Sequence, residues 1–352
     1  MKNLFKSFLF FSLLFAVVAC DEGSEANPPS GSLGSLGTCY VLNSGDWKST
    51  NSSLTMFNSV TGEVVQGYFE LQNGRKLGNL ANDVIVYGSK MYIAVAGEGT
   101  IEVTALDAKS LKQIDCDAQP RYLAAYGGKV YATYYDGYVA RIDTTTLDVE
   151  ATVEVGRNPE QLAVCGGKLF VANSGGMDYN TEVGYDNTVS VIDLVSFSEV
   201  DKITVALNPT GVVSTGNGVF VASYGNYADV PSSLQYISDG GVQYVLPDAC
   251  SQMTEICYNS GTLYGFLSQY DANWNMTATY ISYNPSIGTV DTSWIKEEEQ
   301  PIPYKICAVG DYVCVTSSDY INNGDVYVYD KDGMLASKIA VGLNPIKMVC
   351  AE

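Results

Sequence analysis

The residues of this sequence that could do chemistry are aromatic and polar side chains gathered in five long connecting segments. The segments read SGDWKSTN, SGGMDYNTEVGYDN, SYGNYADVP, SQYDANWNMT and SSDYINNG. Tyrosine and tryptophan offer a large contact area with a polar tip, which suits them to binding surfaces. Histidine is absent from the chain, which removes the usual general base at neutral pH and the commonest metal ligand. This residue set favours ligand binding over catalysis.

We predict that these segments and several shorter connections form one ligand-binding surface. Arginines in the shorter connections would add positive charge near its inner end. The alternative for any single aromatic residue is that it braces its own loop. Scattered Asp and Glu suggest no catalytic constellation, so no catalytic residue is predicted. The predicted ligand-binding residues are Trp47, Arg75, Arg121, Tyr134, Tyr135, Arg157, Tyr179, Tyr185, Tyr224, Tyr227, Tyr270, Trp274 and Tyr320.

Oxygen-bearing side chains in two of these segments could in principle ligate calcium. Their spacing matches no calcium-loop pattern, and solvated loop carboxylates are the alternative, so no metal site is predicted. The residues concerned are Asp178, Asn180, Asp186, Asn187, Asp319 and Asp325.

The elements that must position these segments form a unit that the chain repeats seven times, at intervals of about 40 to 50 residues. The clearest copy has strands at 168–173, 188–193 and 200–206 and a short fourth strand after Asn208 and Pro209. The strands are rich in Val, Ile, Tyr and Thr and are bounded by Gly, Asn, Asp or Pro. An unrelated β-sandwich would not repeat one unit in this way. We therefore predict an all-β, seven-bladed β-propeller of four-stranded antiparallel blades over residues 38–352, without a competing helical pattern.

The repeat also predicts how the ring closes and which face is elaborated. The body begins with the second strand of a unit and ends with a first strand at 345–350, so the C-terminal strand should complete the first blade. Antiparallel order places the long segments and the Asn-Pro connections on one rim. The turns on the opposite rim are tight, for example at Gly166 and Gly167.

Eight cysteines follow Cys20, and none of them forms a CxxC motif. Cys307 and Cys314 should lie opposite each other across a tight turn, and Cys39 and Cys350 should lie on adjacent strands if the ring closes. Both pairs could form disulfides in an oxidising compartment. The alternative is that they are buried thiols that pack as small hydrophobic residues.

The N-terminus has the order of a lipoprotein signal peptide at 1–19, with a basic start, an apolar run and a small residue before Cys20. The apolar run of 12 residues from Phe8 to Ala19 is shorter than the about 20 that a spanning helix needs. Cys20 would carry the lipid, and residues 20–37 would form a flexible linker. Loss of Lys2 and Lys6 takes the net charge from −20 to −22, which disfavours nucleic acid as a partner.

Several segments resemble known families. KLFVANSG, TVSVIDL and ALNPTGVV are similar to the YVTN-type propeller repeat, and RNPEQLAV and LNPIKMVC repeat its Asn-Pro turn. Within that group, YVLNSGDW, NGRKLGNLANDVIVYGSKMYI and GRNPEQLAV resemble the surface lipoproteins that capture cobalamin for a TonB-dependent outer-membrane transporter. The acidic residues Asp21, Glu22 and Glu25 resemble a surface-export signal, although an ordinary linker is the alternative.

The resemblance implies a non-enzymatic lipoprotein that is anchored in the outer membrane, faces the exterior and passes a ligand to a transporter. The ligand would be a corrinoid such as cobalamin, carried rather than used as a cofactor. A protein-binding scaffold is the first alternative. The second is a propeller enzyme that works through paired carboxylates and a metal.

Overall fold

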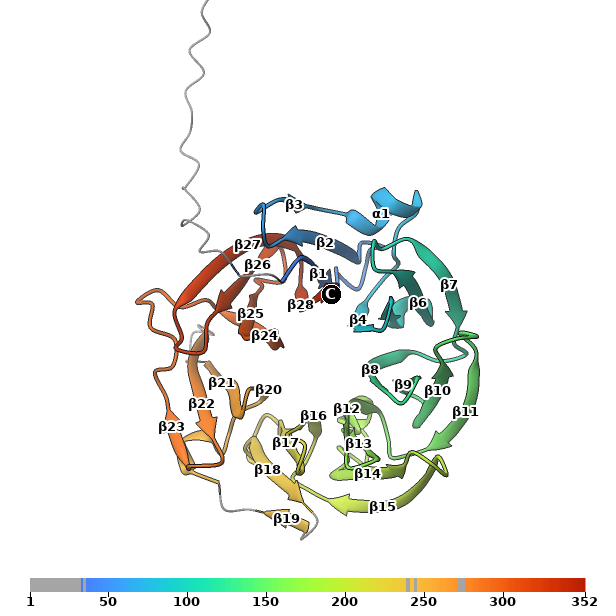
Figure 1. The fold of residues 1–352 in the computed structure, drawn as a ribbon. Coiled ribbons are helices and arrows are strands. Elements are labelled where there is room, and N and C mark those ends of the chain that lie inside the picture. The colour runs from blue at the N-terminus through green and yellow to red at the C-terminus, as the bar shows by residue number, and fades with distance from the viewer. Residues whose placement is uncertain (1–32, 34–35, 239–240, 244–245, 271–275, 352) are drawn as a thin grey trace, which may run out of the picture.

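A computed structural model describes residues 33, 36–238, 241–243, 246–270 and 276–351 of the chain. In these residues the strands form seven four-stranded antiparallel sheets, arranged as blades around a central axis. The chain passes once around the ring, so that the C-terminal strand returns to the first one (Figure 1). The predicted seven-bladed β-propeller is confirmed.

In every blade, the first strand named is the innermost and the last is the outermost. Blade 1 has β28 (Pro345–Ala351), β1 (Thr38–Asn43), β2 (Ser53–Asn58) and β3 (Val64–Val65); blade 2 has β4 (Ala81–Tyr87), β5 (Lys90–Val95), β6 (Thr100–Ala105) and β7 (Ser110–Asp115); blade 3 has β8 (Pro120–Tyr126), β9 (Lys129–Tyr134), β10 (Tyr138–Asp143) and β11 (Val149–Glu154); blade 4 has β12 (Pro159–Cys165), β13 (Lys168–Asn173), β14 (Thr188–Asp193) and β15 (Ser198–Thr204). Blade 5 has β16 (Pro209–Ser214), β17 (Val219–Ser223), β18 (Ser233–Ser238) and β19 (Gly241–Gln243); blade 6 has β20 (Glu255–Asn259), β21 (Thr262–Tyr270), β22 (Met276–Asn284) and β23 (Thr289–Asp291); blade 7 has β24 (Pro303–Val309), β25 (Tyr312–Ser317), β26 (Asn323–Tyr329) and β27 (Leu335–Leu343).

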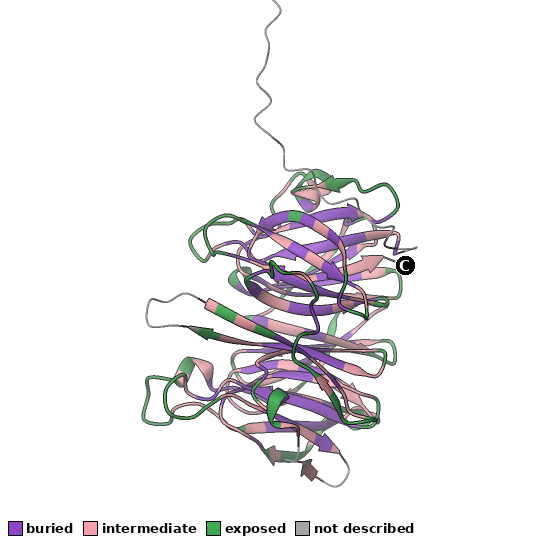
Figure 2. Ribbon diagram, turned by 90° about the vertical axis from the view of Figure 1, so that its left-hand side faces the viewer, coloured by how far each residue is buried: buried purple, intermediate pink, exposed green. Residues whose placement is uncertain are grey.

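Burial along the strands follows from their place in the blade. The second strand of blade 2, β5, is buried at five consecutive positions because neighbouring blades cover both of its faces. The outermost strand of blade 3, β11, has no buried position and alternates between exposed and half-buried residues. Figure 2 shows the same division, with buried residues in the strands and exposed residues in the connections at both ends. The core is therefore a set of apolar layers between blades.

The ring closes as predicted, because β28 pairs with β1 and supplies the innermost strand of blade 1. Val41 lies opposite Met348, and Cys39 lies opposite Cys350. Cys39 and Cys350 form a disulfide. The other pair considered, Cys307 and Cys314, also lies directly opposite on neighbouring strands, but both remain free thiols. The two ends of the folded chain are joined by hydrogen bonds and by a covalent bond.

The Asn-Pro turns that mark the repeat have a definite structural role. Asn158, Asn208 and Asn344 have φ angles of 44°, 60° and 54°, in the left-handed region that asparagine tolerates better than most residues. The following proline disfavours the right-handed helical alternative for each of them. Asn344 also donates from Nδ2 to the carbonyl of Gly45 at 2.8 Å. The turn thereby joins the loops of adjacent blades.

Two features differ from the sequence expectation. A short helix, α1 (Tyr68–Asn73), connects blades 1 and 2 between Gly67 and Gly74, which have φ angles of 63° and 65° and delimit it. Six residues are too few for a helical period to show in the sequence, and only Phe69 is buried. In addition, Leu33 and Leu36, in the predicted linker, are buried in a core cluster with residues of blades 7 and 1.

Residues 1–19 and Cys20 lie outside the described residues, so the signal peptide and the lipid anchor stay predictions. Among the described residues, no helix has the length and apolar character that a membrane crossing requires.

Candidate functional site

A cavity of about 790 Å³ occupies the axis of the propeller. Residues from the innermost strands of all seven blades line it. Its rim includes residues from the connections after the second strands, such as Ser44, Tyr135, Tyr224 and Tyr320. The cavity therefore reaches the rim that carries the long connecting segments. Cavities of this volume are typical of small-molecule sites.

One register position of the innermost strand recurs around this cavity. In each blade, one residue of the innermost strand pairs with the centre of the second strand, as Ile306 does with Val315 and Met348 with Val41. The recurring position is the residue directly before it, Lys305 in blade 7 and Lys347 in blade 1. Its side chains therefore lie at equal height in neighbouring blades. In blades 1 to 7 the position holds Lys347, Asp83, Tyr122, Gln161, Gly211, Glu255 and Lys305.

On one side of the cavity, blades 3 and 4 contribute an ion pair. Arg121 Nη2 lies 3.0 Å from Glu160 Oε2, and both side chains are largely buried. Tyr135 donates its hydroxyl to Glu160 Oε1 at 3.0 Å, and the Arg121 guanidinium stands 4.1 Å from the centre of the Tyr135 ring. Burial and the Glu160 carboxylate both raise the pKa of Tyr135, so its hydroxyl remains a donor. The arrangement fixes one cation and one phenol at the cavity wall.

A second ion pair joins blades 6 and 7. The Lys305 ammonium contacts Glu255 Oε1, and the Tyr224 hydroxyl donates to the same oxygen at 2.6 Å. Burial alone would lower the pKa of Lys305, but the adjacent Glu255 carboxylate outweighs it and raises that pKa well above its ordinary value. Burial and Glu255 likewise raise the pKa of Tyr224. Both cation and phenol are therefore protonated at neutral pH.

A third ion pair joins the closing strand β28 of blade 1 to β4 of blade 2. Lys347 Nζ lies 2.8 Å from Asp83 Oδ1, and Asp83 Oδ2 accepts a hydrogen bond from the Leu123 amide at 2.9 Å. This pair connects blades 1, 2 and 3. Every charged residue described in the lining thus has a partner of opposite charge, although the whole chain is strongly acidic.

Tyrosines complete the wall between the charged groups. Tyr304 and Tyr320 meet edge to face at 5.4 Å, and Tyr224 stacks on Tyr227 at 5.7 Å. Burial raises the pKa of Tyr122 to about 12, and charges from both the Arg121–Glu160 and Lys305–Glu255 pairs act on it. Tyr122 therefore lies near both ion pairs.

The structure brings only part of the predicted binding set to the cavity. Arg121, Tyr135, Tyr224 and Tyr320 line it. Tyr227 stacks behind Tyr224, and Tyr185 lies 6.5 Å from Tyr227, measured between ring centres. Trp47 and Tyr179 are 72% and 66% exposed on their loops and do not line the cavity. Trp274 and the side chain of Tyr270 lie outside the described part of the structure.

Three other predicted residues hold the scaffold together. Arg75 contacts both carboxylate oxygens of Glu102, at 2.9 and 2.8 Å, away from the cavity. Tyr134 is buried, stacks on Tyr138 and donates to Cys116. Arg157 pairs with Asp178 and donates to the Gly184 carbonyl, which braces the long loop of blade 4. None of these three residues lines the central cavity.

Sequence reasoning missed Tyr122, Glu160, Glu255 and Lys305 because it looked for site residues in connecting loops. A usable signal was present for all but Glu255: innermost strands begin PRY, PEQ, PYK and PIK, with a charged residue one or two positions after the proline of the turn. Among the described residues, no group of three or more His, Cys, Asp or Glu is placed to hold a metal.

Comparison with known families adds one assignment. The model of the Domain of unknown function (DUF5074) matches residues 37–227. The chain belongs to the DUF5074 family. The match to the DUF5074 model covers more than half of the chain and includes Arg121, Glu160 and Tyr224, whereas Glu255 and Lys305 lie beyond it.

Solved structures support the fold of this DUF5074 protein. Hydrazine synthase from Kuenenia stuttgartiensis is similar with a TM-score of 0.58 and 15% identity, over 73% of this chain and 85% of that chain. The computationally designed Ika8 protein has a TM-score of 0.52 and 14% identity, over 83% of this chain and 79% of that chain. AztD from Citrobacter koseri has a TM-score of 0.52 and 11% identity, over 89% of this chain and 97% of that chain. A search of curated proteins gave no match.

Proposed function

We propose that this protein is a non-enzymatic binding propeller that holds a small molecule in its central cavity, on the face with the long loops. The observation that carries the proposal is that three ion pairs and several tyrosines lie together around a cavity of about 790 Å³. A few fixed polar groups within an aromatic wall are typical of ligand sites.

The charge balance of the wall indicates the chemistry of the ligand. Each carboxylate at the cavity is neutralised by a lysine or arginine at hydrogen-bond distance. An ion entering the site would have to displace such a partner and leave a buried charge unpaired, which is costly. A neutral ligand with hydrogen-bonding groups on its edge would instead use the remaining N–H donors and oxygen acceptors. Tyrosine rings would cover its flat faces.

A corrinoid is the ligand that we propose on this basis, since it is large, flat and rimmed by amides. The resemblance to cobalamin-capturing lipoproteins supports this choice. We further propose that Cys20 carries a lipid, that the protein is held at the outer membrane facing the exterior, and that it hands its ligand to a TonB-dependent transporter. The engagement of each cavity carboxylate by a cation, together with the lack of histidine, supports a binding role without catalysis.

A protein-binding scaffold is the second candidate, and exposed side chains on the same rim favour it. Trp47 and Tyr227 are each 72% exposed, and Ile321 is 80% exposed. Exposed aromatic and aliphatic side chains on one face are typical of protein interfaces.

Calorimetric titration of the chain from residue 20 onward with cyanocobalamin tests the proposal. We expect saturable binding that Tyr224→Phe weakens about tenfold, because one hydrogen bond that orients Glu255 is lost. Tyr126→Phe is the matched control, since Tyr126 is exposed at the far end of β8 and does not line the cavity. Absence of heat would remove the corrinoid as ligand. Binding that Tyr224→Phe leaves unchanged but Trp47→Ala abolishes would move the site to the rim.

A further inference from the structure

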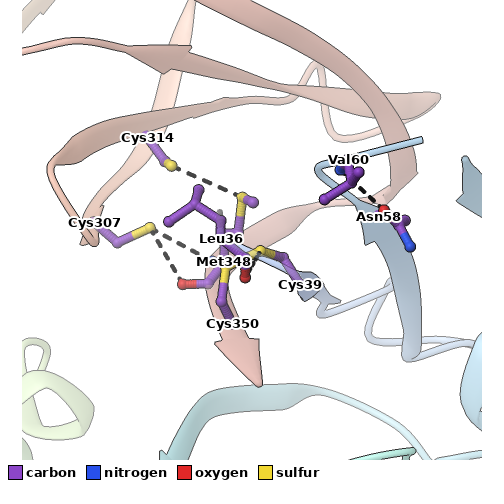
Figure 3. The surroundings of a disulfide bond; sticks show 8 residues. All are labelled: Leu36, Cys39, Asn58, Val60, Cys307, Cys314, Met348 and Cys350. Carbon is purple, nitrogen blue, oxygen red and sulfur yellow. Dashed lines mark hydrogen bonds between the residues drawn. A yellow bond between two sulfur atoms is a disulfide. The ribbon is translucent and has the colours of Figure 1, made fainter. Parts of the chain in front are cut away.

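A cluster of sulfur atoms lies at the interface between blades 7 and 1. Cys307 on β24 is directly opposite Cys314 on β25, and Met348 on β28 faces both from the next blade (Figure 3). Cys314 Sγ lies 3.8 Å from Met348 Sδ, and Cys307 Sγ lies 3.5 Å from the Met348 amide nitrogen. All three side chains are buried in one core cluster. Two thiols and one thioether thus converge from three strands.

The pairing geometry of these thiols differs from that of Cys39 and Cys350. In an antiparallel ladder, narrow and wide residue pairs alternate. Met348–Val41 and Ile306–Val315 are equivalent pairs in blades 1 and 7. Cys350 is two residues after Met348, so the Cys39–Cys350 pair is of the same kind, narrow or wide, as Met348–Val41. Cys307 is one residue after Ile306, so the Cys307–Cys314 pair is of the other kind.

The Cys39–Cys350 pair has a Cα–Cα distance of 3.9 Å and is therefore a narrow pair. Cys307–Cys314 is then a wide pair, whose side chains start further apart. Cys307 and Cys314 are free thiols, and their side chains nevertheless lie within hydrogen-bond reach of each other.

We propose that Cys307, Cys314 and Met348 form a binding site for one copper(I) ion. Thiolate and thioether sulfur are the donors that select copper(I) over harder ions. Three sulfurs at metal distances of about 2.3 Å in a trigonal arrangement lie about 4 Å apart, which agrees with the Cys314–Met348 separation. Binding converts both thiols to thiolates, so each ion releases two protons. The ion would reach the site through the central cavity, because Cys307 lines it.

Titration of the purified chain with copper(I), buffered anaerobically by bicinchoninate and without added thiol, tests this site. We expect one ion per chain by native mass spectrometry, with proton release in weakly buffered solution. Cys307→Ser and Cys314→Ser should each abolish tight binding. Met348→Leu, which keeps the apolar packing, should weaken binding about tenfold or more. Cys250→Ser is the control, because Cys250 is a buried free thiol in a different core cluster.

Three results would overturn the proposal. The first is that no ion is retained against bicinchoninate. The second is that the Cys307 and Cys314 variants bind as the wild type does, which would assign the ion to other thiols. The third is a peptide map of unreduced protein that joins Cys307 to Cys314. If the serine variants fail to fold, as judged by circular dichroism, Met348→Leu decides the matter: unchanged affinity in that variant would refute the site.

Discussion

The Cys39–Cys350 disulfide should contribute strongly to stability because it closes nearly the whole chain into a loop. The two cysteines are 311 residues apart in sequence. A cross-link over a loop of that length lowers the entropy of the unfolded chain by an amount worth about 5 to 6 kcal/mol at 25 °C. We therefore expect the double variant Cys39→Ser/Cys350→Ser to have a lower free energy of unfolding than the wild type, by at most about 5 to 6 kcal/mol. Strands β1 and β28 would still pair through their backbones. Replacing both cysteines avoids an unpaired thiol at the seam.

Urea unfolding, followed by fluorescence and by circular dichroism, measures this loss. The midpoint should fall, and the dependence on urea should steepen slightly, because the open unfolded chain exposes more surface. Wild-type protein unfolded with a thiol reductant should match the double variant. Cys116→Ser is the control, since Cys116 is a free, partly exposed thiol. Equal midpoints for the double variant and the wild type would refute the reasoning, and non-coincident transitions would show that blades unfold separately.

Further predictions concern the seam, the cavity and the N-terminal segment. Deletion of residues 345–352 removes the innermost strand of blade 1 and should abolish cooperative melting in calorimetry; an unchanged melting curve would reject the closure. Arg121→Met should cost about 3 kcal/mol in urea unfolding because Glu160 is left buried without its cation, and adding Glu160→Gln should restore part of that loss. Burial raises the pKa of Tyr122 from 10.0 to about 12, so its contribution to stability is complete below pH 10 and is lost as pH rises from 10 towards 12; Tyr122→Phe should flatten that decline in urea midpoints, and an equally steep decline would contradict the assignment. Leu36→Ala should cost about 2 to 3 kcal/mol, whereas an unstructured linker would give no change in melting temperature.

Much of the fold could be predicted because short local sequence signals identify the repeat. Asn-Pro turns, paired glycines and short strands recur at intervals of about 40 to 50 residues, and each signal acts over a few residues. Helix α1 had no such signal, since its six residues depend on two glycines and on burial of Phe69. The contact of Leu36 with the turn at Gly310 also lay beyond sequence reasoning, because it joins residues at opposite ends of the chain.

The candidate site was harder to predict because its ion pairs join residues far apart in sequence. Arg121 and Glu160 are 39 residues apart, and Lys305 and Glu255 are 50 apart. Each separation is close to one repeat, so the partners occupy equivalent or neighbouring positions of adjacent blades. Opposite charges one repeat apart on innermost strands therefore become neighbours at the axis. Aligning the seven repeats before searching for charges would have found both pairs.

The third pair follows the same rule only after the ring has closed. Lys347 and Asp83 are 264 residues apart in sequence but lie at equivalent positions of blades 1 and 2. Their contact exists because β28 sits against β1, so closure and the cavity wall depend on each other. Opening the seam would leave Asp83, which is almost fully buried, without its cation. Without the disulfide, β1 and β28 still pair through their backbones but separate more easily, so its reduction should weaken ligand binding in the cavity as well as lower stability, although neither cysteine lines the cavity.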